Sequence, residues 1–437
     1  MIRDQTIIKE QFLKSTGKYL FILLLLMVAC FFTWSENVMI TRAIKVVGRL
    51  GVLTGSYLIY KRIINYGAVD SLKWNNPLAI GLYGVYLLIG FASFAWSTNV
   101  GYSMLQWFMT SQTLVFCYFF IKSIYLLDIY FPKHRIRLFN LLGNVSFSLI
   151  LLFIVGMWTL PDVFFRLTHG GEEARLGGYF MNPNELGMLA GLGIAGLIFD
   201  LFQDDQKKWW TIVKLLVLFY GLYATGSRSS LIGAFLIIGF HIFQSSNKKL
   251  KYIAFGMMLL VTPIAVHKII FKDGDQSRME EVLSMTGRLP FWTALINEGL
   301  PKEPLLGYGF MRIAYKEYFQ GVHTYPGKMT HNTFIQVLMN LGFIGLTVIL
   351  FHLIFTFYGI YQEPQLKKQV LLTLLIPLII NSFTEFGIFG ESNYGILFYQ
   401  LILMYISFQP RLILSPRERI YLRKKRPELQ LATRSKF

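Results

Sequence analysis

The sequence is poor in cysteine and in charge. Only two cysteines occur in 437 residues. Cys30 and Cys117 both fall inside apolar runs, so we expect neither a disulfide framework nor a cysteine-based metal site. Charged residues make up 15% of the chain, whereas a soluble protein carries about 25%. The low charge excludes a water-soluble globular protein.

Long apolar runs take the place of charge. Hydrophobic residues make up 54% of the chain, the mean hydropathy is +0.48, and runs of about 20 apolar residues, enough to cross a bilayer, recur from end to end. The sequence therefore predicts an all-α polytopic membrane protein with about twelve transmembrane helices. They are expected at 19–35, 43–60, 77–96, 102–121, 138–160, 183–202, 209–226, 229–244, 252–270, 331–359, 370–389 and 393–410. The second begins with three basic residues, so a short or interfacial helix is the alternative there.

The net charge of +18 indicates topology rather than nucleic-acid binding. Lys and Arg residues stand between the apolar runs, and in short loops such residues stay on the cytoplasmic side. With the N-terminus inside, more than half of the 42 Lys and Arg residues fall in cytoplasmic segments, and both termini are cytoplasmic. The basic tail is then a juxtamembrane anchor against anionic lipid. The first apolar run lacks a cleavage pattern and is expected to be a retained span.

This topology divides the chain into four parts. Residues 1–270 carry the first nine spans, 271–330 form a large extracytoplasmic loop with short amphipathic helices, 331–410 carry the last three spans, and 411–437 are the tail. Loops as long as 271–330 are usually functional. The chain has no convincing internal repeat, which weakens a transporter built from paired halves.

The first polar motif runs from Arg175 to Glu185 and closes the other long outer loop, 161–182. Asn182, Pro183 and Glu185 have the spacing of a capping box, so the Asn-Pro-Asn part, which includes Asn184, is explained by the start of a helix. Arg175 is harder to explain in this way. A guanidinium beside two glycines and a helix N-terminus is suited to contact phosphate.

Two further motifs add arginines on the same face. Ser227 and Arg228 lie in a tight turn between two spans, where a cation indicates a functional site, although an arginine snorkelling at a helix end is the alternative. In the large loop, Arg288 is expected just before a short helix that Pro290 begins. Tyr308 lies in a Gly-Tyr-Gly turn farther along that loop, where its ring is a candidate for stacking on a sugar, although membrane interfaces also enrich tyrosine.

The fourth motif opens the tenth span with Thr330, His331, Asn332 and Thr333. If Thr330 caps this helix, His331 falls in the first turn, where the helix dipole disfavours imidazolium. A neutral histidine can act as a general base, although a lone interfacial histidine is often only a polar rim residue. Glu385, at the outer end of the eleventh span, is a candidate to orient His331 or an arginine.

Evidence for a metal is thin. Asp273 and Asp275 have the spacing of a cation clamp, but a turn in the outer loop explains them better. The sequence therefore predicts no metal and no cofactor.

Taken in order, these motifs resemble the O-antigen ligase and O-antigen polymerase superfamily of bacterial membranes. The resemblance rests on Arg-x-x-Gly-x-Phe-x-Asn-Pro-Asn, Gly-Ser-Arg-Ser, Gly-Arg with Trp in a large outer loop, and His-Asn-Thr-Phe-Ile-Gln with a trailing Gly-x-x-Gly. It covers about 175–346. The members are membrane-embedded glycosyltransferases of the C type. They transfer a saccharide from an undecaprenyl-pyrophosphate carrier to an acceptor saccharide on the outer face of the bacterial plasma membrane, without metal.

The resemblance implies roles for the motif residues. Arg228 and Arg288, with Arg175, would hold the carrier pyrophosphate, and His331 would activate the acceptor hydroxyl for inverting transfer. It implies lipid-linked donor and acceptor saccharides as partners within the bilayer, with a chain-length regulator or flippase of the same pathway as a further candidate partner. Asn332 and Thr333 follow His331 where ligases have serine, which favours a polymerase and leaves a ligase open. A lipid-linked sugar transporter or flippase is the alternative from another class.

Overall fold

The computed structural model describes residues 2–408 apart from positions 71, 169–172, 204–207, 245–247, 249–250, 253–255, 257–287, 311–329, 386 and 391. The predicted span at 252–270, the basic tail, and the motif residues Asp273 and Asp275 lie wholly or almost wholly outside the described residues. Of the large predicted loop, residues 288–310 and Thr330 are described.

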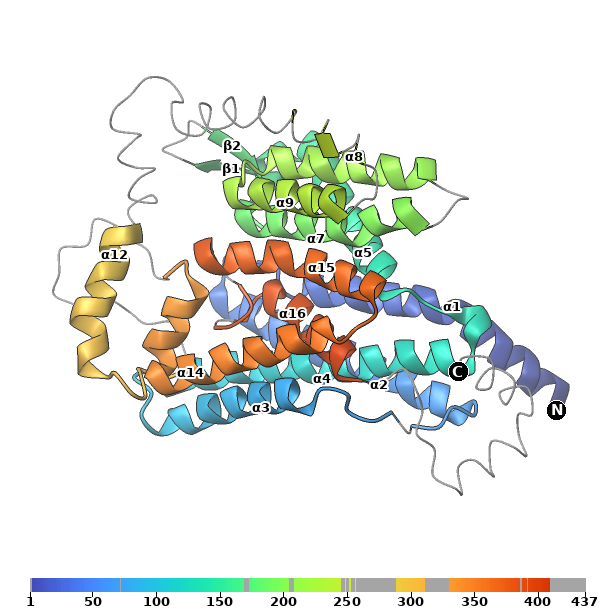
Figure 1. Ribbon diagram of the computed structural model, residues 1–437, viewed down its shortest axis with the longest axis horizontal. Coiled ribbons are helices and arrows are strands. Elements are labelled where there is room, and N and C mark those ends of the chain that lie inside the picture. The colour runs from blue at the N-terminus through green and yellow to red at the C-terminus, as the bar shows by residue number, and fades with distance from the viewer. Residues whose placement is uncertain are drawn as a thin grey trace.

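The described chain is almost entirely helical (Figure 1). In chain order the elements are α1 (Ile2–Ala29), α2 (Val38–Asn65), α3 (Pro77–Ala92), η1 (Ser93–Ala95), α4 (Val100–Tyr130), η2 (Pro132–His134), α5 (Leu138–Thr159), α6 (Pro161–Phe164), β1 (Phe165–Thr168), β2 (Glu173–Leu176), α7 (Pro183–Gln203), α8 (Lys208–Ala224), α9 (Arg228–Gln244), α12 (Arg288–Ala294), η5 (Leu295–Gly299), η6 (Leu300–Lys302), α14 (Thr333–Tyr361), α15 (Gln365–Thr384) and α16 (Tyr394–Ser407). A helix stands at every predicted span that falls within these residues, including the second, which is a full-length helix.

The helices pack in two groups that α15 joins. In Figure 1, α5, α7, α8 and α9 lie together at the top, and α1 to α4, α14 and α16 lie below. Helix α15 packs against α7 and α9 on one side and against α14 and α16 on the other. Helix α16 is buried along nearly its whole length and contacts α3, α4, α14 and α15. It forms the centre of the lower group.

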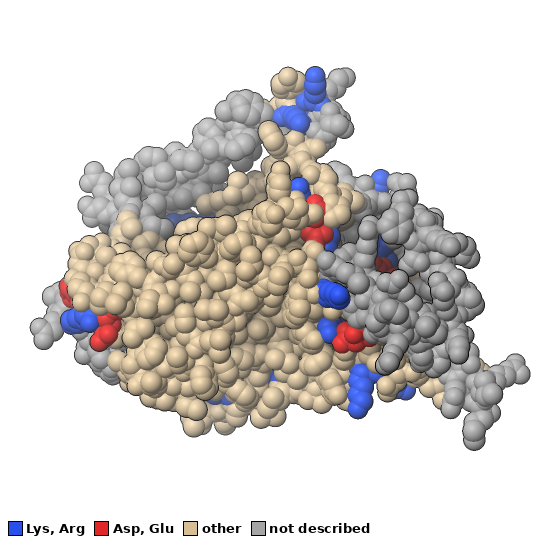
Figure 2. Space-filling view, turned by 60° about the horizontal axis from the view of Figure 1, so that its bottom comes forward, with Lys and Arg blue, Asp and Glu red and all other residues tan. Residues whose placement is uncertain are grey.

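Apolar side chains cover much of the outside of the bundle. Six helices are long and apolar enough to cross a membrane, and 183–199, α9 and α16 are shorter apolar helices. Large side chains such as Trp158, Leu88 and Leu216 are more than 60% exposed, which a water-soluble protein would not tolerate in such numbers. Figure 2 shows a broad face without Lys, Arg, Asp or Glu between charged residues near opposite margins. The protein is therefore an all-α, multi-pass membrane protein, and the number of twelve spans stays a prediction.

Predicted cytoplasmic segments meet at one end of this bundle. Lys122, at the C-terminal half of α4, forms an ion pair with Asp70 of the loop after α2, with 2.8 Å between Nζ and Oδ2. Lys367, in the first turn of α15, lies 3.3 Å from the hydroxyl of Tyr125 in α4. Segments 61–76, 122–137 and 361–369 thus share one end, as the charge pattern requires.

Part of the large loop docks into a break in α14. Gly342 has φ 61° and ψ −163°, which interrupts the helix and frees the carbonyl oxygens before it. The amides of Tyr308 and Gly309 donate to the carbonyls of Met339 and Asn340 at 2.9 and 2.8 Å. Loop 303–310 therefore satisfies backbone groups that the break exposes.

Candidate active site

Glu385 is the centre of a polar network at the other end of the bundle. It follows the last residue of α15 as the C-cap, and its side chain is only 4% exposed. Its Oε1 accepts hydrogen bonds from Arg288 at 2.7 Å and from Nδ2 of Asn184 at 2.8 Å. Its Oε2 lies 2.8 Å from Nδ1 of His331. One buried carboxylate thus joins three motifs that lie far apart in the sequence.

Arg288 reaches this carboxylate from α12. One amino group pairs with Glu385, and the other donates to the carbonyl oxygen of Thr384. Arg288 is itself helical, which corrects the expectation that it precedes a helix begun by Pro290; proline fits anywhere in the first turn, because the amides there have no partner within the helix. Trp292, one turn later, donates from Nε1 to the carbonyl of Thr330 at 2.6 Å. The short helix is thereby tied to the segment that carries His331.

Arg175 joins the network through Asn184. It lies on β2, paired with Arg166 of β1 in an antiparallel hairpin. Its Nε donates to the carbonyl of Thr225 at 2.7 Å, and an amino group donates to Oδ1 of Asn184 at 2.6 Å. Gly178 fixes the path after β2, because its φ is +59° and a Cβ there would lie 2.0 Å from the carbonyl oxygen of Val163. The guanidinium therefore links the hairpin, the turn between α8 and α9, and the start of α7.

His331 stands just before α14 rather than in its first turn. Asn332, and not Thr330, is the N-cap, since its side chain accepts from the amides of Phe334 and Ile335. The expectation of a Thr330 cap is therefore wrong. The hydroxyl of Thr330 instead accepts from the amide of Asn332 at 3.2 Å, and asparagine caps a helix at least as well as threonine. His331 has φ 50°, an unusual value for a residue other than glycine.

The segment after Glu385 is anchored by buried polar groups. Arg49 is fully buried in α2 and donates to Oγ of Ser392 at 2.8 Å. The hydroxyl of Tyr86 accepts from the amide of Gly390 at 3.2 Å. Sequence analysis treated Arg49 as one of the basic residues that weaken the second span, and missed this contact. The available signal was an arginine inside an apolar run, which marks a buried polar partner.

Charge around Glu385 decides its ionisation. Burial alone would raise the pKa of this carboxyl group. The hydrogen bond and charge of His331, followed by the charge and hydrogen bond of Arg288, outweigh burial and hold the pKa below its ordinary value. Glu385 is therefore an ionised hydrogen-bond acceptor at neutral pH.

Three other predicted residues have local structural contacts. Ser227 is buried, and its hydroxyl accepts from the amide of Ser230 at 3.4 Å, at the start of α9. Asn332 caps α14 and donates from Nδ2 to the carbonyl of Phe383 at 3.4 Å. Tyr308 is 5% exposed and donates its hydroxyl hydrogen to the carbonyl of Gly299 at 2.8 Å. The ring of Tyr308 packs with Phe291 and is covered there.

Arg228 lies outside the printed contacts of the network. It is the first residue of α9 and is exposed. Gly226, two residues earlier, lies against Arg175, because a Cβ at that position would lie 3.1 Å from Arg175 Nε. The structure thus brings together Arg175, Asn184, Arg288, His331 and Glu385, with the turn that carries Arg228 beside Arg175. Among the described residues, no group of three or more His, Cys, Asp or Glu could hold a metal ion.

The fold and this network define a multi-pass membrane protein with a buried carboxylate that binds a histidine and a guanidinium. Residues 213–350 match the family model of O-antigen ligase, which confirms the resemblance to this superfamily over that segment. The match includes Arg228, Arg288 and His331 and leaves out Arg175, Asn184 and Glu385.

Two curated proteins are similar to the chain. One is the exopolysaccharide production protein ExoQ of Rhizobium meliloti (strain 1021), 25% identical over 249 residues, which are 50% of this chain and 55% of that protein. The other is the teichuronic acid biosynthesis protein TuaE of Bacillus subtilis (strain 168), 23% identical over 369 residues, which are 76% of this chain and 72% of that protein. The chain thus spans about half the length of the first relative and nearly three quarters of the second.

Proposed function

We propose that the protein polymerises undecaprenyl-pyrophosphate-linked oligosaccharide units into a cell-surface polysaccharide by inverting glycosyl transfer. The observation that carries this proposal is the network in which Glu385 binds both His331 and Arg288. The reaction would take place on the outer face of the bacterial plasma membrane, with both termini of the chain in the cytoplasm. The names of the two relatives support polysaccharide synthesis as the general role.

Glu385 and His331 would act together as a base. An ionised Glu385 accepts a hydrogen bond, so Nδ1 of His331 carries the hydrogen and Nε2 is the basic nitrogen of the neutral ring. Nε2 would take the proton of the acceptor hydroxyl as its oxygen forms a bond to the anomeric carbon of the donor. The bond from that carbon to the carrier pyrophosphate breaks on the opposite side, which inverts the configuration. Glu385 would stabilise the imidazolium that forms.

The arginines would stabilise the leaving pyrophosphate. Within the described part of the chain, the buried Nε of Arg288 has no hydrogen-bond partner, and an unsatisfied buried donor is costly. A phosphate oxygen would satisfy it. Arg228 is exposed at the start of α9, and Arg175 lies against the preceding turn. Guanidinium groups bind phosphate oxygens in pairs, so the arginines would neutralise the developing charge without a metal ion.

Reconstitution tests the base. Wild-type protein in vesicles should elongate undecaprenyl-pyrophosphate-linked repeat units, and His331→Ala should lower the rate by at least about 100-fold, the usual contribution of a general base. His134→Ala is the matched control, because His134 pairs with Glu10 far from the network, and it should retain wild-type activity. If His331→Ala elongates the units as fast as wild type, the proposed base is wrong.

The second candidate is a ligase that transfers finished glycan to a lipid or wall acceptor. The description of the matched family favours it. Vesicles that contain both lipid-linked repeat units and the alternative acceptor would separate the two functions. A ladder of lengthened lipid-linked chains supports the polymerase, and label found only on the second acceptor supports the ligase.

A further inference from the structure

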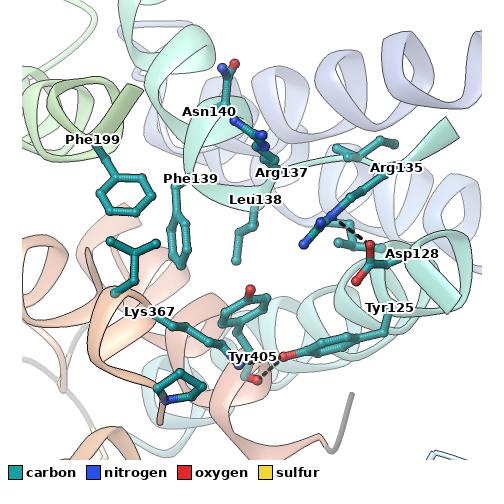
Figure 3. Close-up of a pocket in the computed structure, with 14 residues that line it drawn as sticks. Tyr125, Asp128, Arg135, Arg137, Leu138, Phe139, Asn140, Phe199, Lys367 and Tyr405 are labelled. Atoms are coloured by element: carbon teal, nitrogen blue, oxygen red, sulfur yellow. Dashed lines mark hydrogen bonds and ion pairs between the residues drawn. The ribbon is translucent and has the colours of Figure 1, made fainter. Parts of the chain in front are cut away.

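A cavity of about 290 Å³ opens at the end of the bundle opposite Glu385. It lies among the C-terminal parts of α4, α7 and α16 and the N-terminal parts of α5 and α15. In Figure 3 the side chains of Arg135, Phe139, Phe199, Lys367 and Tyr405 stand around an open space. No part of the proposed reaction uses this cavity.

Cations exceed anions on the cavity wall. Arg135, Arg137 and Lys367 line it, and Asp128 is the one carboxylate among its lining residues. Arg135 pairs with Asp128 at 2.7 Å, yet its side chain is 61% exposed, so it can also reach a ligand. Lys367 pairs with Glu363 at 2.9 Å and is 17% exposed. Its ammonium group also lies 4.3 Å from the centre of the Tyr405 ring, which holds it at the wall.

Two helices begin at this cavity. Helix α5 starts after Arg137 and α15 starts after Pro364, and neither residue provides a side-chain cap. The first backbone N–H groups of a helix have no partner within the helix, and they carry partial positive charge. Both starts line the cavity together with the three cationic side chains. The combination favours a ligand with negatively charged oxygen atoms.

The remaining wall is apolar. Leu138, Phe139, Phe199 and Leu366 line it, and such a surface would be poorly matched to a small hydrated ion. An amphiphile with a charged head and a hydrocarbon chain satisfies both surfaces. The predicted cytoplasmic position of segments 122–137 and 361–369 places such a ligand in the inner leaflet, where anionic lipids bind basic pockets between transmembrane helices.

We propose that this cavity binds an anionic glycerophospholipid from the cytoplasmic leaflet. Its phosphate group contacts Arg135, Arg137 and Lys367, and an acyl chain lies against the phenylalanine and leucine side chains. The site is separate from the Glu385 network, because the 18 residues of α15 from Lys367 to Glu385 rise by about 27 Å. It does not depend on the proposed transferase activity, and its test needs no saccharide substrate.

The experiment measures lipid binding to the purified full-length protein in detergent. Phosphatidylglycerol, phosphatidylcholine and inorganic phosphate are each titrated, with bound lipid counted by native mass spectrometry and the unfolding midpoint measured in parallel. Phosphatidylglycerol should bind and raise the midpoint, and phosphatidylcholine should bind at least about tenfold more weakly. Equal binding of the two lipids overturns the proposal. If inorganic phosphate displaces phosphatidylglycerol at equal concentration, the acyl chain contributes nothing and the lipid assignment is wrong.

Charge-matched variants locate the site. Arg135→Gln with Arg137→Gln should weaken phosphatidylglycerol binding about tenfold or more. Lys61→Gln with Lys73→Gln is the control, since both lysines are exposed in a predicted cytoplasmic segment and do not line the cavity. Arg137→Gln alone keeps the Arg135–Asp128 ion pair and covers the case in which the double variant folds poorly; it should still weaken binding. Unchanged binding in folded Arg137→Gln and in the double variant overturns the proposal.

Discussion

Glu385 balances charges that would otherwise be buried without compensation. Its side chain is 4% exposed, and that of Arg288, its partner, is 17% exposed. Removal of one member of such a pair is far more costly than the pair is worth, because the other charge stays buried. Glutamine has nearly the same shape as glutamate but no charge, so it separates shape from electrostatics.

Glu385→Gln should lower glycosyl transfer by at least about 100-fold, because His331 loses the acceptor that fixes its tautomer and stabilises its charged form. Initial rates with lipid-linked repeat units measure this. Glu298→Gln removes an exposed carboxylate of η5 and should retain normal rates. Wild-type rates in folded Glu385→Gln would show that the carboxylate has no part in catalysis.

The pKa of Glu385 predicts how stability depends on pH. The folded-state pKa lies below its ordinary value, so the ionised group stabilises the fold at pH values above the unfolded-state pKa. This contribution is lost as the pH falls through the lower, folded-state pKa. The unfolding midpoint of wild type should therefore exceed that of Glu385→Gln by a constant amount near neutrality, and the difference should close in acid. A difference that widens in acid would contradict the sign.

At the scale of elements, the break in α14 joins a helix to a loop. Gly342 has positive φ, and a Cβ there would lie 2.2 Å from the backbone of Leu305. Gly342→Ala should therefore detach loop 303–310 from α14 and lower the unfolding midpoint by about 5 °C or more. Gly84→Ala in α3 is the control, because a Cβ there meets nothing within 4 Å. It should leave the midpoint unchanged or raise it slightly.

Helix positions could be predicted from apolar runs and caps, whereas helix ends depended on competition between neighbours. Asn182 was expected to cap α7, and its Oδ1 accepts from the amide of Asn184 at 2.9 Å. At α14 two capping residues stand close together, and propensity alone does not choose between Thr330 and Asn332. The choice depended on the Trp292 contact with the Thr330 carbonyl, which comes from another helix.

The same limit applies to the site. Residue type and order indicated Arg175, Arg288, His331 and Glu385, but nothing in the sequence gives the distances among them. Glu385 meets its partners only because α15 ends where α7, α12 and α14 begin. The carbonyl oxygens of Thr225 and Thr384 bind the arginines as backbone groups, so their side chains gave no signal.

At the scale of the whole molecule, the scarcity of cysteine makes the topology testable. Cys30 and Cys117 are both buried, so each single cysteine introduced at an exposed site can be labelled against a silent background. Asp162→Cys, in α6, should react with a membrane-impermeant maleimide added outside cells, and Lys61→Cys should react only after the membrane is opened. The reverse pattern would place the Glu385 network on the cytoplasmic side.

Metal removal is a second test on the whole molecule. The proposed chemistry needs cations only from arginine, so wild-type vesicles treated with EDTA should elongate repeat units at the untreated rate. Arg288→Lys, measured in the same assay, should lose activity, because lysine cannot replace a forked guanidinium. Loss of activity in EDTA with recovery on addition of Mg²⁺ would contradict the metal-independent mechanism.

The central position of α16 has a consequence for biogenesis. This helix is made after every other described element, yet it occupies the middle of the lower group and touches α3, α4, α14 and α15. Its neighbours cannot complete their packing while the ribosome is still translating the residues before Tyr394. Maturation of the enzyme is therefore expected to be post-insertional, with a chain truncated ahead of this segment inserted into the bilayer but degraded by membrane quality control.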